Sequence, residues 1–181
     1  KWFDASGGIL REDGEYGDRA VTFRGNPLII RTLLNPETTT VFEAHMGLTQ
    51  QWAAKLLALG YPDDMALMYD ASTGDSEYTL AQLANAQSGI SHESFHFALN
   101  NTVVSDNRIP PWKMSYDQAK ARNALPVPAS QYGSPGPGQV YDHYAEVYMT
   151  PPADAVSATV RLMYQPTSWE YIQFLALANN G

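Results

Sequence analysis

The clearest chemical motif in this sequence is a literal H-E-x-x-H, formed by His92, Glu93 and His96. On a helix, residues four positions apart share a face, so the two imidazoles can bind zinc while the glutamate acts as a base. The motif therefore raises one candidate function, a metal-dependent hydrolase or a zinc- or copper-binding protein.

The residues around this motif favour a strand over a helix. Gly89 stands three residues before His92, and apolar and polar residues then alternate over residues 92–104, which is the period of a half-buried strand. In a strand, at about 3.3 Å per residue, His92 and His96 would lie roughly 13 Å apart, too far to share one small ion. We therefore expect both histidines to be structural and keep the metal site as the alternative.

The remaining histidines and one acidic loop are further candidates. His45 and His143 stand singly in strand-like runs, so we expect each to be buried and hydrogen-bonded. The alternative is that one of them, as a neutral imidazole, reaches a haem iron in a neighbouring domain or chain. Oxygen ligands also gather in one loop, at Asp70, Ser72, Asp75 and Glu77. Their spacing does not match an EF-hand, so we expect a solvated turn, with calcium as the alternative.

Composition excludes several other classes of function. The chain has 181 residues, no cysteine and a formal net charge of −8. Without cysteine it has no disulfide, no thiolate metal site and no C-x-x-C-H attachment for covalent haem. The negative charge would be repelled by nucleic-acid phosphates and anionic lipids. No G-x-S-x-G elbow is present, and no run approaches the roughly 18 apolar residues of a membrane-spanning helix.

Periodicity predicts a mostly-β chain with a few short helices. Apolar residues at helical spacing, with Thr49 as a cap, predict a helix over residues 49–59, and aromatic or alternating runs predict strands over 140–149 and 155–164. A capping box of Thr167 and Glu170 begins a C-terminal helix that buries Trp169. We therefore predict one antiparallel β-sandwich domain over residues 1–181, in which the strands of residues 1–37 are least distinct.

An ordered set of residues in the C-terminal part carries a family resemblance. The set comprises Asp106-Asn107-Arg108-Ile109-Pro110-Pro111, Tyr116, Pro126-Val127-Pro128, Pro151-Pro152 and the run from Tyr164 to Leu175. Over residues 38–181 it resembles the haem-free, C-terminal β-domain of bacterial multihaem c-type cytochromes. Those proteins are exported, and their haem motifs lie in an N-terminal part.

The resemblance implies an accessory, structural or docking role in electron transfer rather than catalysis. It implies a haem-bearing domain or chain as the partner, and a secreted, periplasmic or cell-surface location. The chain opens at Lys1 without a methionine, and we expect it to be part of a larger protein or assembly. The shared residues have scaffold chemistry, since Arg108 can pair with Asp106 or Glu170 and Asn107 can tie its loop by side-chain hydrogen bonds. A third hypothesis, from the four tryptophans and eleven tyrosines, is carbohydrate or surface adhesion through exposed aromatic rings.

Overall fold

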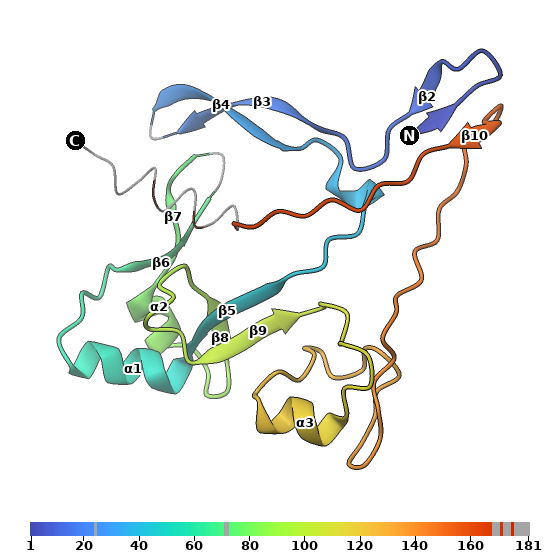
Figure 1. Cartoon of the computed structure of the whole chain (residues 1–181). Coiled ribbons are helices and arrows are strands. Elements are labelled where there is room, and N and C mark those ends of the chain that lie inside the picture. The colour runs from blue at the N-terminus through green and yellow to red at the C-terminus, as the bar shows by residue number, and fades with distance from the viewer. Residues whose placement is uncertain (24, 71–72, 168–170, 172–174, 176–181) are drawn as a thin grey trace. The chain divides into compact units, whose positions relative to one another are not determined.

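The structure is a computed structural model, which describes residues 1–23, 25–70, 73–167, 171 and 175. The chain is mostly β, with several small antiparallel sheets and a few short helices (Figure 1). It divides into two compact units. Unit 1 comprises residues 1–41 and 146–168, and unit 2 comprises residues 42–145 and 169–181. The prediction of a single domain stays a prediction.

Unit 1 contains two small sheets. Strands β1 (Trp2–Phe3), β2 (Ile9–Arg11) and β10 (Ser157–Ala158) form an antiparallel sheet in the order β10-β1-β2. Strands β3 (Tyr16–Phe23) and β4 (Asn26–Leu33) form a hairpin whose register runs from Tyr16 opposite Leu33 to Phe23 opposite Asn26. The short 3-10 helix η1 (Pro36–Thr38) follows. Gly25 stands in the turn between the two strands of this hairpin.

Unit 2 is organised around strand β5 (Ala44–Thr49), which has a neighbour on each side. Strands β8 (Ser91–Glu93) and β9 (Thr102–Asp106) both pair antiparallel with it. Strands β6 (Ala66–Tyr69) and β7 (Ser76–Thr79) form a separate antiparallel pair. Among the described residues of this unit there are also three short helices, α1 (Gln50–Ala58), α2 (Leu80–Ala84) and α3 (Tyr116–Ala121).

Side-chain caps determine where these helices begin. The Thr49 hydroxyl accepts a hydrogen bond from the Trp52 N–H at the start of α1, as the sequence predicts. Helices α2 and α3 each begin with a complete capping box, Thr79 with Gln82 and Ser115 with Gln118. Each box satisfies backbone donors that a helix start otherwise leaves without partners.

The hydrophobic core lies in unit 2, where β5, α1, β6 and α2 meet. Its members are almost wholly inaccessible to solvent, and they are Leu48, Ala53, Leu56, Leu67, Leu80 and Leu83. Trp52 and Leu99 pack against this cluster, and the indole N–H of Trp52 donates to the Leu99 carbonyl at 2.8 Å. The core therefore joins two helices to strands from two different sheets.

Three sequence-predicted strands are wrong or much shorter than expected. Residues 92–104 are divided between β8 and β9, because the chain turns after Ser94. The Ser94 hydroxyl accepts a hydrogen bond from the His96 N–H, and the Leu99 and Asn100 N–H groups donate to the His96 carbonyl. Residues 140–149 contain one isolated bridge, between Val140 and Ser115. Of residues 155–164, only Ser157–Ala158 form a strand. The predicted C-terminal helix falls mostly outside the described residues.

Helix α1 offers a matched test of the core. Leu56 is 1% exposed, whereas Leu59, at the C-terminal end of the same helix, is 64% exposed. We expect Leu56→Ala to lower the free energy of unfolding by about 2–4 kcal/mol, because it removes buried methyl groups and leaves a cavity. Leu59→Ala should change it by less than about 0.5 kcal/mol. Urea denaturation measures both, and equal effects would show that this cluster is not the core.

Candidate functional site

The H-E-x-x-H residues do not converge on a common point. His92 lies on β8 and stacks flat on Tyr78, with ring centroids 4.0 Å apart and an interplanar angle of 4°. Its Nδ1 lies 2.8 Å from the Glu93 carbonyl oxygen. His96 lies beyond the strand end, and its Nε2 lies 2.8 Å from the Ala66 carbonyl oxygen. Each imidazole thus has one ring nitrogen bonded to backbone.

Within the described residues, no group of three or more histidines, aspartates or glutamates is placed so that it could hold a metal ion. The metal-site hypothesis for His92 and His96 stays a prediction. Elemental analysis of the purified chain before and after chelation tests it. About one equivalent of zinc or copper, lost in His92→Ala, would support a metal site. The absence of both metals would contradict it.

Glu93, the expected base of the motif, instead bonds to a histidine on the neighbouring strand. His45 Nδ1 contacts a Glu93 carboxylate oxygen, and His45 Nε2 lies 3.1 Å from a Glu43 carboxylate oxygen. We call these three side chains the His45 clamp. The clamp joins β5 to the end of β8, and the His45 side chain is 21% exposed. Sequence reasoning missed Glu43, although residues two apart on a strand share a face.

The clamp favours the charged form of His45. The hydrogen bond that the His45 ring donates to the Glu93 carboxylate is the main cause, assisted by Glu43, and together the two carboxylates raise the pKa of His45 to about 9 against the opposing effect of burial. His45 is therefore an imidazolium at neutral pH. An imidazolium has no lone pair for a metal or haem iron, so this histidine is a poor ligand for either. The expectation that His45 is hydrogen-bonded is confirmed, whereas the expectation that it is buried is met only in part, because its side chain is 21% exposed.

The predicted scaffold residues 106–108 form a tightly bonded corner beside the clamp. Arg108 makes two hydrogen bonds with the buried Asp106 carboxylate, at 2.9 and 2.7 Å, and its backbone N–H makes a third at 3.1 Å. Of the two partners expected for Arg108, the structure shows Asp106. Asn107 Oδ1 accepts from the Glu43 N–H at 2.7 Å, so this corner fixes the residue that completes the clamp. Thr167 is half-buried, and Trp169 and Glu170 lie outside the described residues.

The acidic loop after β6 is only partly described. The Asp70 carboxylate accepts a hydrogen bond from the Thr73 N–H at 2.8 Å, and the Asp70 N–H donates to the Asp75 carbonyl at 2.9 Å. Glu77 lies on β7 and is exposed, and Ser72 lies outside the described residues. These bonds make a local turn, and the calcium hypothesis stays a prediction.

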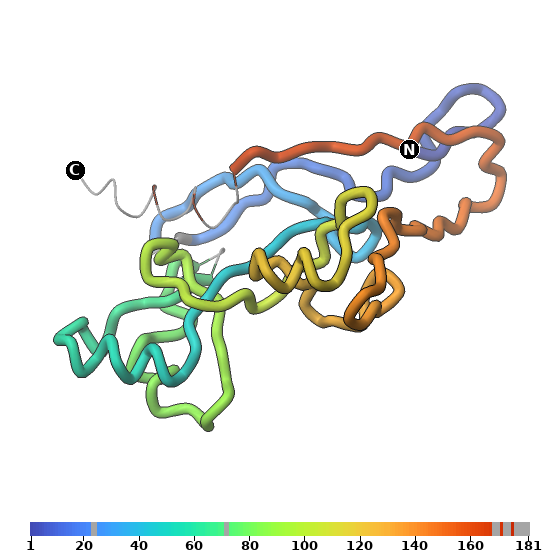
Figure 2. Tube along the Cα trace, turned by 60° about the horizontal axis from the view of Figure 1, so that its bottom comes forward, coloured from blue at the N-terminus to red at the C-terminus, as the bar shows by residue number. Residues whose placement is uncertain are grey.

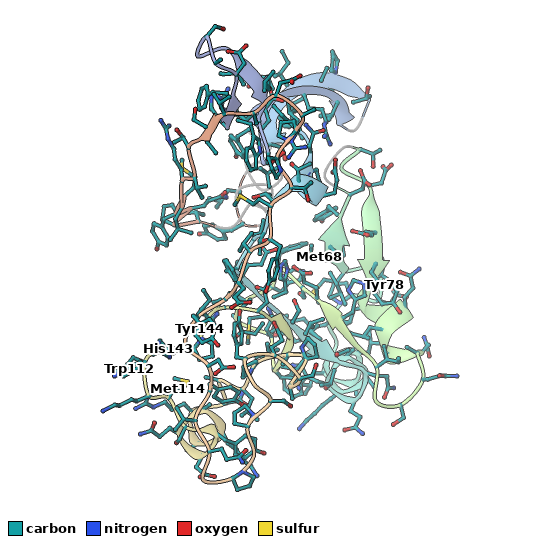
Figure 3. The ribbon with its side chains drawn as sticks, turned by 90° about the vertical axis from the view of Figure 1, so that its right-hand side faces the viewer. Met68, Tyr78, Trp112, Met114, His143 and Tyr144 are labelled. Carbon is teal, nitrogen blue, oxygen red and sulfur yellow. The ribbon has the colours of Figure 1, made fainter. Side chains whose placement is uncertain are left out.

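An exposed aromatic surface lies on the loops beside α3. The Tyr141 N–H donates to the Met114 carbonyl at 3.0 Å, and Ser115 bridges to Val140. This pairing brings Trp112 against His143, edge to face, with ring centroids 4.3 Å apart, and His143 in turn lies 5.8 Å from Tyr144. Figure 3 shows these rings together with Met114. We call Trp112, His143 and Tyr144 the aromatic surface.

The aromatic surface is open to solvent. Trp112 is 67% exposed and Tyr144 is 55% exposed. The expectation that His143 is buried and hydrogen-bonded is wrong, since it is exposed and, within the described residues, bonds through neither ring nitrogen. Sequence reasoning singled out no role for Trp112, although Pro110 and Pro111 before it cannot enter a central strand and so indicate a surface loop.

Comparison with known proteins gives no match to any family model, curated protein or solved structure. In the described part of the chain, no helix is long and apolar enough to cross a membrane.

The His45 clamp makes stability depend on pH in one direction. The pKa of His45 is about 9 in the folded chain and 6.5 in an unfolded one. The contribution of the clamp to the free energy of unfolding is therefore complete below about pH 6.5 and is lost as the pH rises through 9. After screening by solvent we expect the free energy of unfolding to fall by roughly 1–2 kcal/mol between pH 6.5 and 9.5.

Replacement of the histidine tests this dependence. His45→Gln should remove most of the decrease between pH 6.5 and 9.5, whereas the exposed control His143→Gln should retain it. Denaturant unfolding at several pH values measures both variants. An identical decrease in wild type and His45→Gln would contradict the clamp.

Proposed function

We propose that this chain is a non-catalytic accessory or docking domain of an exported multihaem cytochrome system. The residue pattern over residues 38–181 supports the family, and the aromatic surface supports the docking role. The corresponding location is the periplasm, the cell surface or the extracellular medium. The proposal includes a β-sandwich closed by a C-terminal helix, which the mostly-β content and antiparallel pairing support in part.

The aromatic surface is the single observation that carries this proposal. Large aromatic side chains are enriched where proteins bind one another, because they remove much apolar area from water at little cost in side-chain entropy. Trp112 is 67% exposed and stands beside an exposed tyrosine. The favourable free energy of removing these rings from water is gained only when another surface covers them. The partner that the family resemblance implies is a haem-bearing domain or chain.

His143 is the histidine best placed to contact the partner's haem. His45 is charged, and His92 and His96 each bond to a backbone carbonyl through one ring nitrogen. Within the described residues, neither ring nitrogen of His143 forms a hydrogen bond, and its ring contacts the exposed rings of Trp112 and Tyr144. A neutral imidazole in this position can act as an axial ligand to iron.

Capture of haem proteins tests the docking role. Tagged chain is incubated with the cell-envelope fraction of its source organism, and captured proteins are separated and stained for the peroxidase activity of covalently bound haem. We expect a haem-stained partner with wild type, and about 30-fold weaker binding with Trp112→Ala, as for a hot-spot tryptophan. Leu59→Ala, which removes an exposed leucine elsewhere in unit 2, should bind as wild type.

Two results would reject the proposal. One is the absence of any haem-stained partner, and the other is equal capture by wild type and Trp112→Ala. His143→Ala resolves the role of the imidazole. If the His143 imidazole binds the haem iron, its removal in His143→Ala changes the Soret band of the captured complex. An unchanged Soret band limits His143 to a packing role.

A further inference from the structure

Residues 156–164 form an edge of unit 1 whose backbone is partly unpaired. Thr159 and Lys1 exchange two backbone hydrogen bonds of 2.9 Å, which continue the pairing of β10 with β1. Successive residues of a regular strand direct their N–H and C=O groups to opposite sides. The alternation is irregular before β10, where the Val156 N–H donates to the Phe3 carbonyl at 2.9 Å. Beyond Thr159 it directs the backbone groups of Val160 and Leu162 away from β1. Within the described residues, neither forms a backbone hydrogen bond.

The same segment exposes apolar side chains on one face. Val156 is 65% exposed, Val160 70%, Leu162 92% and Tyr164 86%. These even-numbered residues share a face if the extended chain beyond β10 keeps the period of a strand, and Figure 2 shows the chain running on from β10 as a nearly straight tube. An exposed apolar edge with unpaired backbone groups is a template for pairing with another strand.

This edge is complementary to itself. In an antiparallel pair related by a twofold axis at Val160, Val156 lies opposite Tyr164 and Ala158 lies opposite Leu162. A β-branched residue opposite an aromatic one is a favourable cross-strand pair. The one charged residue of the segment, Arg161, lies opposite Thr159, so no like charges face each other directly. The residues whose backbone groups point outward, 158, 160 and 162, also lie opposite one another, as hydrogen-bonded pairing requires.

We propose that residues 156–164 pair antiparallel with the same residues of a second copy of this chain, joining the two β10-β1-β2 sheets across a twofold axis. Such an interface is isologous, because both copies use the same surface. The inference goes beyond the proposed function and uses residues of unit 1, whereas the aromatic surface belongs to unit 2. Failure of either proposal therefore leaves the other untouched.

The size and charge of the interface predict its affinity. A nine-residue edge contact buries less than the roughly 1,600 Å² of a standard interface, so we expect dissociation in the micromolar range. Each copy carries a net charge of −8, and this repulsion is screened by salt. Association should therefore strengthen between about 0.05 and 0.5 M sodium chloride, because the contact itself is apolar and backbone hydrogen-bonded.

Sedimentation equilibrium with paired variants tests the proposal. Over about 1–300 µM, the wild type should shift from one to two chains of 20.0 kDa. Val160→Pro should abolish dimers, because it removes the outward N–H at the twofold axis. Arg161→Pro, whose N–H faces the other way, should weaken them at most about threefold. All variants change exposed positions, and circular dichroism checks their folding.

A second pair of variants tests the apolar face. Leu162→Lys should abolish the dimer by placing a charge on the shared face, whereas Met163→Lys, on the opposite face, should retain it. A wild type that remains monomeric over the whole range would overturn the proposal. So would a dimer that persists in both Val160→Pro and Leu162→Lys, since that dimer would use another surface.

Discussion

Strand β5 can have a neighbour on each side only because residue 47 lacks a side chain. A methyl group on Gly47 would lie 2.0 Å from the His92 carbonyl oxygen and 2.7 Å from a Val104 methyl carbon, well inside van der Waals contact. The strand positions much else in unit 2. It places Leu48 in the core, His45 in the clamp and Thr49 as the cap of α1. The core, the clamp and the first helix therefore all depend on this close backbone approach.

Local sequence signals predicted the elements whose stabilising contacts are local. Helix α1, which the sequence predicts with Thr49 as its cap, has that cap and its apolar face within a few residues of one another. The H-E-x-x-H pattern was less informative, because Glu93 bonds to His45, 48 residues away. Alternation over 155–164 predicted a long strand, but a strand also needs a partner, and within this stretch β1 pairs only with Ser157 and Ala158. Nonlocal contacts of this kind leave little trace in a single sequence.

The four histidines acquire different chemistry from their surroundings. Two carboxylates keep His45 charged, stacking and a backbone carbonyl orient His92, and a carbonyl of β6 orients His96. His143 packs against the rings of Trp112 and Tyr144 and, within the described residues, bonds through neither ring nitrogen, so it retains the capacity to bind something outside the chain. This division of roles follows from hydrogen-bond partners that the sequence alone does not reveal, and it is why the docking proposal centres on the aromatic surface.

Replacement of Gly47 tests the dependence of unit 2 on β5 most directly. Gly47→Ala should lower the free energy of unfolding by at least about 2 kcal/mol, because backbone rather than a flexible side chain must move to accommodate the methyl group. Gly136→Ala is the matched control, since a methyl group there meets only the Gln139 side chain, at 3.8 Å. Urea unfolding measures both. A large loss in Gly47→Ala alone is the result that this account predicts, and unchanged stability in Gly47→Ala would contradict it.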